Sequence, residues 1–329
     1  HIGLPLCLAN FSKDCDYGIF EMGMNHLNEI EPLCRLTKPH LAIITNVGPV
    51  HIEFFKDEEE IALAKSEIFS GIENGGFALI NSDNKHFKFL KKRAEISGIL
   101  SNNILSFGES DKSNYQIEKS EVENVKTSKV FLKIENSGKN SQNISYKIAS
   151  SSKALIFNSS IIIAALDIIT NDVKPGISKL INFEDEAGRG KAFEAIFDDK
   201  KIIIIDDSYN ASLPSMKAGI EHAAKLKSAL NKNRVIVALG DMLELGEKSL
   251  ELHEEITNYL KELEIDFSIL VGDKISLATK RLNNNTYKIF PNSESASLEI
   301  KDLLQDGDIL YVKGSRGIKM EKIIHKITE

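Results

Sequence analysis

Three side chains in the first part of the chain have the types and placement of ligand-binding groups: Glu21, His51 and Lys65. Glu21 ends an apolar run, 17–21, that we predict to be a short buried strand, and His51 follows a second such run at 41–47. In open α/β sheets, the groups just beyond the carboxyl ends of the strands line the ligand crevice. We therefore expect Glu21 and His51 to lie at the same edge of one sheet.

Lys65 stands out because it falls on the apolar side of a predicted helix. Residues 57–60 (Asp-Glu-Glu-Glu) supply carboxylates to the first turn of that helix, where the helix dipole favours them. The apolar stripe behind this turn recurs at helical spacing at Ile61, Ala64, Ile68 and Ile72. One interpretation is a lysine that extends its ammonium past apolar neighbours into water. The other is an amine whose pKa is lowered by burial and which is therefore reactive.

Polar loops follow predicted strands in the second half of the chain as well. Residues 206–210 (Asp-Asp-Ser-Tyr-Asn) come directly after a buried strand at 202–205, and residues 313–316 (Lys-Gly-Ser-Arg) follow the last strand. Residues 239–246 are a strand end followed by a loop bracketed by glycines. Helix caps and glycine turns use the same residue types, so each loop also has a purely structural interpretation.

The elements that carry these loops alternate regularly between strand and helix. Strands separated by helical patterns are predicted at 235–239, 267–271, 287–290 and 309–312. Such alternation predicts a parallel sheet with helices on its faces, here with Rossmann-like topology. We do not predict a dinucleotide site, because no Gly-x-Gly-x-x-Gly follows a strand. Before this sheet, 192–197 and 202–205 should form a hairpin.

The first half is predicted to be α/β with an antiparallel insertion. Strands at 77–81 and 104–107 flank a basic helix at 85–97, and a buried helix is expected at 153–169. Residues 115–148 alternate with period two around a polar, glycine-containing turn, which indicates an antiparallel ribbon. A polar loop at 185–190 separates the halves, so we predict two domains, 1–182 and 183–329.

Composition excludes several classes of function. A net charge of −7 without a long basic block argues against nucleic acid as the main partner. The longest apolar run, near 160–169, includes Asp167, so we expect no membrane insertion. Three cysteines without Cys-x-x-Cys spacing predict reduced thiols and a cytoplasmic location.

The ordered set of motifs resembles the Mur ligases over nearly the whole chain, the ribbon at 115–148 excepted. Glu21-x-Gly23, Thr45–His51 and Ala64-Lys-Ser-Glu67 are similar to the central ATPase domain of that family. The resemblance continues to the C-terminus through Gly188-Arg-Gly190, 206–211 and 307–316. The most similar branch adds D-alanyl-D-alanine to UDP-N-acetylmuramoyl-tripeptide. Its fold is a central ATPase-type domain followed by a Rossmann-like α/β domain.

The resemblance implies an ATP-dependent amide ligase of peptidoglycan precursor synthesis that acts as a monomer. ATP would phosphorylate the peptide carboxylate, and the amine of D-alanyl-D-alanine would then displace phosphate from the acyl phosphate. Mg²⁺ and cationic side chains neutralise phosphoryl oxygens in such chemistry.

Site residues are carried over from the family by position. Glu21 and His51 correspond to magnesium ligands, and Lys65 corresponds to a carbamylated lysine beside the metal. Carbon dioxide requires a neutral amine, which burial favours. Nucleotide contacts correspond to Asn158 (adenine), Arg189 (phosphate), Asp207 (ribose), Tyr209 and Asn210. Residues expected near the peptide or D-alanyl-D-alanine are Lys313, Ser315 and Arg316. Catalytic roles fall to Lys65, Arg189 and His51.

The chain also departs from the family pattern, which leaves other functions open. It contains no Gly-Lys-Ser or Gly-Lys-Thr, and it opens at His1 without a methionine. We therefore expect a fragment without the upstream domain and phosphate loop, inactive by itself. The alternatives are another Mur-type ligase, a folylpolyglutamate synthase, a phosphoryl-transfer kinase or a non-catalytic binding remnant. The absence of Asp-Asn-Pro-Arg counts against the diaminopimelate-adding type.

Overall fold

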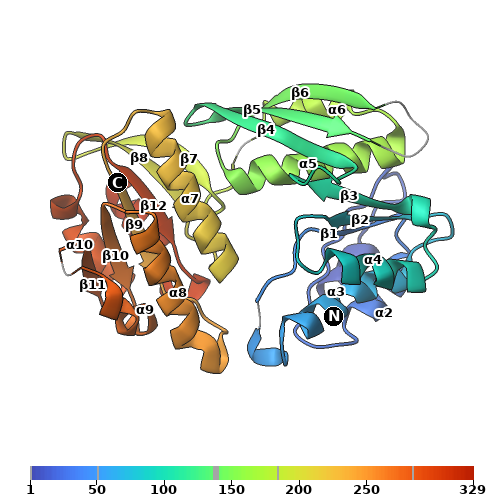
Figure 1. The fold of residues 1–329 in the computed structure, drawn as a ribbon, viewed down its shortest axis with the longest axis horizontal. Helices are drawn as coiled ribbons and strands as arrows, with labels where there is room; N and C mark the ends of the chain where they lie inside the picture. Colours follow the sequence, from blue (N-terminus) through green and yellow to red (C-terminus); the bar gives the residue numbers. More distant parts are fainter. Residues whose placement is uncertain (1, 50–51, 136–140, 184, 284) are drawn as a thin grey trace. The chain divides into compact units, whose positions relative to one another are not determined.

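The computed structural model describes residues 2–49, 52–135, 141–183, 185–283 and 285–329 of the chain. The described residues form two six-stranded sheets with helices, which confirms the predicted α/β class (Figure 1). By compactness the chain divides into one unit of His1–Lys119, Phe131–Ile144 and Ser160–Gly176, and a second unit of Ser120–Val130, Ser145–Ser159 and Ile177–Glu329.

The first sheet combines a parallel part with the predicted ribbon. The pairs β1–β2, β2–β3 and β3–β4 are parallel. Two residues connect β4 to β5, a connection so short that the two strands must be antiparallel. The strand order is β1 (Leu41–Ile44), β2 (Phe77–Asn81), β3 (Ile104–Gly108), β4 (Tyr115–Asn124), β5 (Thr127–Ile134) and β6 (Gln142–Ile148).

The helices of the first half are mostly short. They are α1 (Gly3–Ala9), α2 (Ile30–Thr37), α3 (Glu58–Ser66), α4 (Phe87–Ile96), α5 (Lys153–Thr170) and α6 (Lys174–Leu180). Single turns of 3₁₀ helix, η1 to η3, occupy Ile52–Phe54, Glu67–Gly71 and Ser101–Asn103. By length and composition alone, α5 could span a membrane. Its Asp167 instead accepts a hydrogen bond from the buried hydroxyl of Tyr115 in β4, 2.8 Å away, so α5 packs on the sheet.

The predicted strand at 17–21 does not form. The segment is irregular, and Tyr17 and Ile19 are 65% and 98% exposed. Among the described residues β1 is an edge strand of its sheet, and 17–21 does not pair with it. An apolar run becomes a strand only when a neighbouring strand satisfies its backbone hydrogen bonds, and 17–21 forms no such pairing.

The helix that carries Lys65 begins as predicted but ends earlier. Asp57 caps it, because its carboxylate accepts the backbone N–H of Glu60 at 2.9 Å. Ile61 and Ala64 are fully buried, as the apolar stripe requires. The α-helix ends at Ser66 and continues as 3₁₀ helix η2, so the predicted continuous stripe to Ile72 was wrong in its last turn.

The second sheet has the order β11-β10-β9-β12-β8-β7, and only β7 is antiparallel to its neighbour. The last strand in sequence, β12, therefore lies between β8 and β9, which confirms a parallel α/β sheet with a crossover. Its strands are β7 (Lys191–Phe197), β8 (Lys200–Asp207), β9 (Val235–Gly240), β10 (Phe267–Val271), β11 (Tyr287–Phe290) and β12 (Ile309–Lys313).

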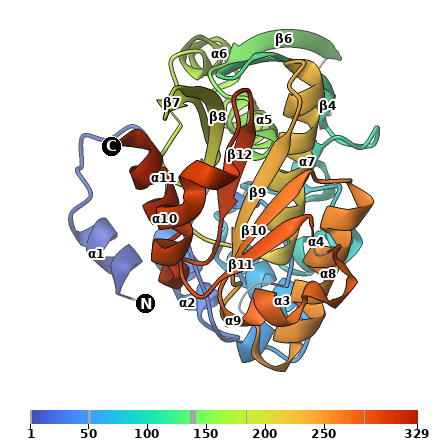
Figure 2. The same ribbon diagram turned by 90° about the vertical axis from the view of Figure 1, so that its left-hand side faces the viewer.

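Helices cover both faces of this sheet. Figure 2 shows α10 and α11 on one face and α7 and α8 on the other. The core on the α10–α11 face contains alternate residues of the strands, such as Ile202 and Ile204 of β8, with Ile300 and Ile323 of the helices. The helices are α7 (Leu213–Ala229), α8 (Ser249–Glu262), α9 (Asp273–Leu277), α10 (Ser293–Leu303) and α11 (Glu321–Thr328), with 3₁₀ turns η4 (Gly246–Lys248), η5 (Thr279–Arg281) and η6 (Arg316–Ile318).

Candidate functional site

The carboxyl ends of β8 and β12 bring two predicted site residues together. The strand register places Lys313 directly opposite Asp207. The Lys313 Nζ lies 2.6 Å from the Asp207 Oδ2, and the Tyr311 hydroxyl donates a hydrogen bond of 3.0 Å to the same oxygen. Lys313 is only 3% exposed, so its ammonium is engaged by Asp207 and is not free to contact a substrate directly. The structure shows this ammonium in an ion pair with Asp207, and the expected place of Lys313 near the peptide or D-alanyl-D-alanine stays a prediction.

Burial and charge act in opposite directions on the Asp207 carboxylate. Burial raises the pKa of Asp207, while the charge and hydrogen bond of Lys313 and the hydroxyl of Tyr311 oppose that rise, and Asp206 adds to it. Burial also raises the pKa of the Tyr311 phenol well above its usual value, so this group stays a hydrogen-bond donor. Asp207 retains an opening to solvent, because its side chain is 22% exposed.

Tyr209 and Arg316 closely follow Asp207 and Lys313 in the sequence, and together with Arg189 they form a cationic cluster. The Arg189 Cζ lies 4.4 Å from the centroid of the Tyr209 ring, and the Arg316 Cζ lies 5.3 Å from it. All three side chains are exposed, and aromatic rings attract guanidinium groups at such distances. Two guanidinium groups around one ring make this surface suited to a phosphate or a carboxylate.

The backbone around Gly188 explains why Arg189 reaches the β8 loop. The N–H of Gly188 donates to the Asp206 carboxylate at 2.8 Å, and its carbonyl accepts the N–H of Tyr209 at 3.0 Å. Gly190 donates to the Asp206 carbonyl at 2.7 Å. Gly188 has φ +80° and a Cβ there would lie 3.0 Å from the Tyr209 Cβ, so the motif requires glycine.

Ser315 connects the last loop to residues 239–246. Its hydroxyl accepts the N–H of Leu243 at 2.9 Å, and its own N–H donates to the Asp241 carbonyl at 3.1 Å. His253 holds the same loop, because its Nε2 accepts the N–H of Met242 at 2.9 Å. Ser315 is 4% exposed and its hydroxyl is engaged in fixing this loop, and its expected place near the peptide or D-alanyl-D-alanine stays a prediction.

Two predicted nucleotide residues remain exposed. Asn210 lies in the loop before α7, where its side-chain oxygen accepts the N–H of Ala211 at 2.8 Å. Asn158 lies on α5 with an exposed side chain. Both are therefore accessible to a ligand, as their expected roles require.

The first half brings Lys65 to the loop after β1. Its Nζ donates to the carbonyl of Asn46 at 2.9 Å, and desolvation lowers the pKa of this half-buried lysine. Glu21 lies exposed on the irregular segment, and His51 lies outside the described residues. Among the residues that the structure describes, no group of three His, Cys, Asp or Glu side chains is arranged to hold a metal ion.

Glu67, from the same motif as Lys65, has a structural role that the sequence did not predict. Its carboxylate accepts the backbone N–H groups of Asn28, Ile30 and Glu31 at 2.6, 3.1 and 3.2 Å. It thereby caps the N-terminus of α2 from another part of the chain, where the helix dipole favours an anion. The segment after Glu21 is fixed to the segment that carries Lys65.

Tyr311 and His253 are the other residues that the sequence analysis missed. The available signal for Tyr311 was its position two residues before Lys313 on a strand, which places both side chains on one face. His253 had no comparable signal, because it lies on α8 and contacts the loop that precedes this helix.

Comparisons with known proteins agree with this arrangement. Residues 1–166 match the Mur ligase middle domain, and residues 193–316 match the Mur ligase, glutamate ligase domain. A UDP-N-acetylmuramoyl-tripeptide–D-alanyl-D-alanine ligase from Rickettsia prowazekii is 34% identical, over 98% of this chain and 69% of its own length.

Solved structures show the same fold. A crystal structure of MurF from Acinetobacter baumannii has a TM-score of 0.84 at 23% identity and covers 99% of this chain and 67% of its own. MurF from Thermotoga maritima in complex with ADP has a TM-score of 0.80 at 22% identity, with 99% and 70% covered. These likenesses show that the chain shares the fold of these proteins.

Proposed function

The chain belongs to the Mur ligase family, and we propose that it catalyses the ATP-dependent joining of D-alanyl-D-alanine to UDP-N-acetylmuramoyl-tripeptide. The observation that carries this proposal is the match of 98% of the chain with a relative named for that reaction. We also keep the domain limits of 1–182 and 183–329 as part of the proposal.

The reaction consists of two transfers with a balanced exchange of bonds. A carboxylate oxygen of the tripeptide attacks the γ-phosphorus of ATP, the bond to the ADP oxygen breaks, and an acyl phosphate forms. The amine of D-alanyl-D-alanine then attacks the acyl carbon, and phosphate leaves with the former carboxylate oxygen. Both steps need neutralisation of negative oxygens and exact positioning more than they need a strong base.

Residues at the ends of β8 and β12 would bind the nucleotide and the anionic reactants. Arg189 and Arg316 supply two exposed guanidinium groups within contact of the Tyr209 ring, which supports a role in binding phosphoryl or carboxylate oxygens. Asp207, whose side chain is 22% exposed, would accept a ribose hydroxyl. Asn158 and Asn210 are exposed and would contact the adenine and the nucleotide loop.

Glu21, His51 and Lys65 are proposed to hold Mg²⁺, with Lys65 carbamylated. The described residues fit in one respect, because burial lowers the pKa of Lys65 and so increases the share of neutral amine that carbon dioxide can attack. Carboxylate oxygens such as those of Glu21 and of a carbamate are the ligands that Mg²⁺ prefers. When bound, Mg²⁺ supplies charge neutralisation at the phosphoryl oxygens.

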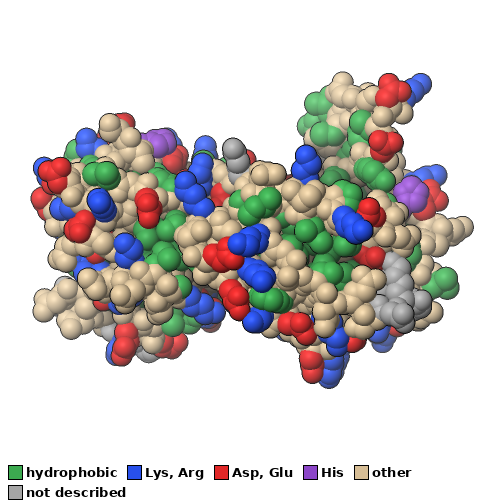
Figure 3. All heavy atoms as spheres, turned by 90° about the horizontal axis from the view of Figure 1, so that it is seen from above, with side chains coloured by type: hydrophobic (Ala, Val, Ile, Leu, Met, Phe, Trp, Pro, Cys, Tyr) green, Lys and Arg blue, Asp and Glu red, His purple; other side chains and the backbone are tan. Residues whose placement is uncertain are grey.

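The surface and the thiols are compatible with a cytoplasmic monomer that binds neither nucleic acid nor membrane, which remains part of the proposal. Acidic and basic side chains intermingle on the face drawn in Figure 3. The basic side chains of the described residues on that face do not form a continuous stripe of the kind that follows a nucleic-acid backbone. Cys7, Cys15 and Cys34 are free thiols, as a reducing compartment allows.

The test is a product assay on the polypeptide as it is encoded, with residues 1–329 assayed beside it. ATP, Mg²⁺, UDP-N-acetylmuramoyl-tripeptide and D-alanyl-D-alanine are supplied, and the products are identified by mass spectrometry. We expect a pentapeptide product and one phosphate per product, both dependent on D-alanyl-D-alanine. We expect residues 1–329 alone to bind nucleotide without turnover.

An Arg189→Met variant should lose most of this activity, while Arg35→Met should retain it. Arg35 is a matched control, because both arginines are exposed and each pairs with a nearby glutamate. Arg35 pairs with Glu31 and Arg189 pairs with Glu186. A phosphorylated substrate without an amide product would identify a kinase. Amide formation with diaminopimelate, lysine or glutamate in place of D-alanyl-D-alanine would identify a sister ligase.

A further inference from the structure

We propose that Lys313 and Tyr311 are positioning residues that fix one oxygen of the Asp207 carboxylate, so that its other oxygen can accept a hydroxyl group of the nucleotide. This inference rests on the proposed function, which places a nucleotide at the loop after β8. It assigns to Lys313 an indirect role in nucleotide binding.

The strand register makes the arrangement specific. Lys313 and Tyr311 lie two residues apart on β12 and face the same side, where Asp207 ends β8. Both donate to the Asp207 Oδ2, at 2.6 and 3.0 Å, and the Lys313 Nζ also lies 3.5 Å from the Asp207 backbone oxygen. The Oδ1 atom has no hydrogen-bond partner among the described residues.

Burial separates the two donors from solvent and leaves only the acceptor accessible. The side chain of Lys313 is 4% exposed and Tyr311 is fully buried, whereas the Asp207 side chain is 22% exposed. A ligand in solvent therefore meets the carboxylate but not the ammonium or the phenol. A direct contact of Lys313 with a peptide substrate does not fit this burial.

A glycine in α7 provides the space for the phenol. A Cβ on Gly219 would lie 1.9 Å from the Tyr311 hydroxyl oxygen and 2.2 Å from its Cζ. Any side chain at this position would displace the phenol from Asp207. The helix that follows the nucleotide loop is thus shaped around the hydrogen bond.

The charges predict what removal of Lys313 does. Burial and Asp206 favour the protonated form of Asp207, and Lys313 and Tyr311 are the groups that oppose them. Breaking a buried ion pair leaves an uncompensated charge, which is relieved when the carboxylate takes up a proton. A protonated Asp207 is a poorer acceptor for a hydroxyl, so nucleotide binding should become dependent on pH.

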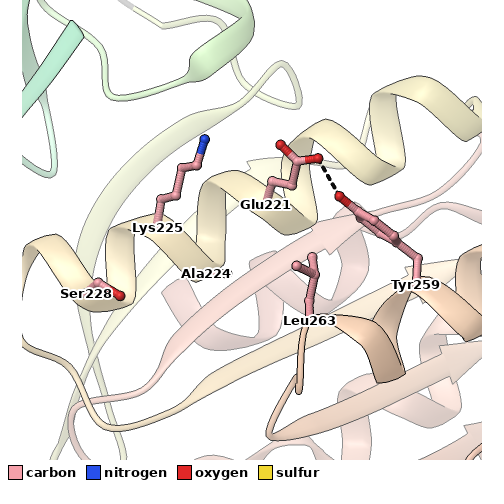
Figure 4. Close-up of a pocket in the computed structure, with 6 residues that line it drawn as sticks. All are labelled: Glu221, Ala224, Lys225, Ser228, Tyr259 and Leu263. Carbon is pink, nitrogen blue, oxygen red and sulfur yellow. Dashed lines mark hydrogen bonds between the residues drawn. The ribbon is translucent and has the colours of Figure 1, made fainter. Parts of the chain in front are cut away.

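The experiment measures the dissociation constant of ADP by calorimetry between pH 6 and pH 9 for the wild type, Lys313→Met and Tyr311→Phe. Tyr259→Phe is the matched control, because the Tyr259 hydroxyl also donates to a carboxylate, that of Glu221, in a shallow groove between α7 and α8 (Figure 4). Loss of the Tyr259 hydroxyl should leave the dissociation constant of ADP unchanged. Near-ultraviolet circular dichroism verifies that each variant is folded.

We expect Lys313→Met to bind ADP about tenfold more weakly at pH 6 to 7 and to recover affinity as the pH rises, because a charge-assisted hydrogen bond is lost when Asp207 protonates. Tyr311→Phe should bind ADP about threefold more weakly than the wild type, with a smaller dependence on pH, as expected for the loss of one neutral hydrogen bond. The wild type should show no such dependence.

Wild-type affinity in both variants, or equal weakening of the folded variants at every pH, would overturn the inference. If Lys313→Met does not fold, Tyr311→Phe and Gly219→Ala still test it, because both disturb the same hydrogen bond. Failure of the wild type to bind ADP would overturn the proposed nucleotide site itself, which is a different result.

Discussion

The buried histidine of α7 makes a quantitative prediction about stability and pH. His222 is 6% exposed, and its Nε2 has no hydrogen-bond partner among the described residues. Burial lowers the pKa of His222 from 6.5 to about 4, with a smaller contribution from the nearby charge of Lys225. The same helix follows the Tyr209 loop and packs on Tyr311, so its stability affects the candidate site.

The sign of the effect follows from proton uptake. Between pH 6.5 and 4 the unfolded chain binds a proton at His222 and the folded chain does not, so stability is present above this range and is lost as the pH falls through it. Lowering the pKa of His222 from 6.5 to about 4 corresponds to a loss of roughly 3 kcal/mol in the free energy of unfolding. About 2 kcal/mol of this loss occurs between pH 7 and pH 5.

The perturbation is His222→Leu, which removes the titrating group and keeps an apolar side chain of similar size. Urea unfolding followed by circular dichroism gives the free energy of unfolding at pH 7 and pH 5. The variant should lie within about 1 kcal/mol of the wild type at pH 7, because an apolar replacement leaves no unpaired nitrogen. At pH 5 the free energy of unfolding of the variant should exceed that of the wild type by about 2 kcal/mol.

Exposed His325 on α11 provides the control, since His325→Leu should follow the wild type at both pH values. The reasoning is refuted if the free energies of the wild type and of His222→Leu fall in parallel between pH 7 and 5. Parallel curves would mean that His222 is protonated equally in the folded and unfolded chains.

Three further predictions concern the loops around the site. Glu67→Gln should lower the free energy of unfolding by about 1–3 kcal/mol, because an amide cannot accept hydrogen bonds from all three N–H groups that the Glu67 carboxylate binds. The control is Glu73→Gln at an exposed position, which should leave the free energy of unfolding unchanged. Equal urea midpoints for the two variants would contradict the capping role. Gly188→Ala should cost about 1–2 kcal/mol in the same assay, because alanine is strained at φ +80°; an unchanged midpoint would argue against the observed turn. Tyr209→Ala should weaken ADP binding several-fold, because both guanidinium groups lose their ring contact, and an unchanged calorimetric dissociation constant would show that the ring does not orient them.

The sequence predicted the second half of the fold well because local patterns are sufficient there. Every predicted strand between 192 and 312 forms within two residues of its expected limits, since buried apolar runs bounded by turn residues are strong local signals. The position of β12 between β8 and β9 was not predictable, because sequence order does not fix strand order in a sheet. That position is what pairs Asp207 with Lys313.

The failures have the same origin in tertiary context. The 17–21 run has the composition of a strand but lacks a neighbouring strand among the described residues. Lys313 was placed near the substrate by its position in a motif that resembles the Mur ligases, and only the structure shows its burial and its ion pair with Asp207. For Lys65 the helical stripe left two interpretations open, and the lowering of its pKa by burial agrees with the second of them.

The central claim is that this chain belongs to a ligase that activates a carboxylate as an acyl phosphate. The most direct test labels the terminal carboxylate of the UDP-N-acetylmuramoyl-tripeptide with ¹⁸O and follows the label during turnover of the encoded polypeptide with ATP, Mg²⁺ and D-alanyl-D-alanine. We predict that each released phosphate carries one ¹⁸O atom of the labelled carboxylate and that the new amide carbonyl keeps the other. Phosphate without ¹⁸O, released at the same rate with or without D-alanyl-D-alanine, would contradict the account.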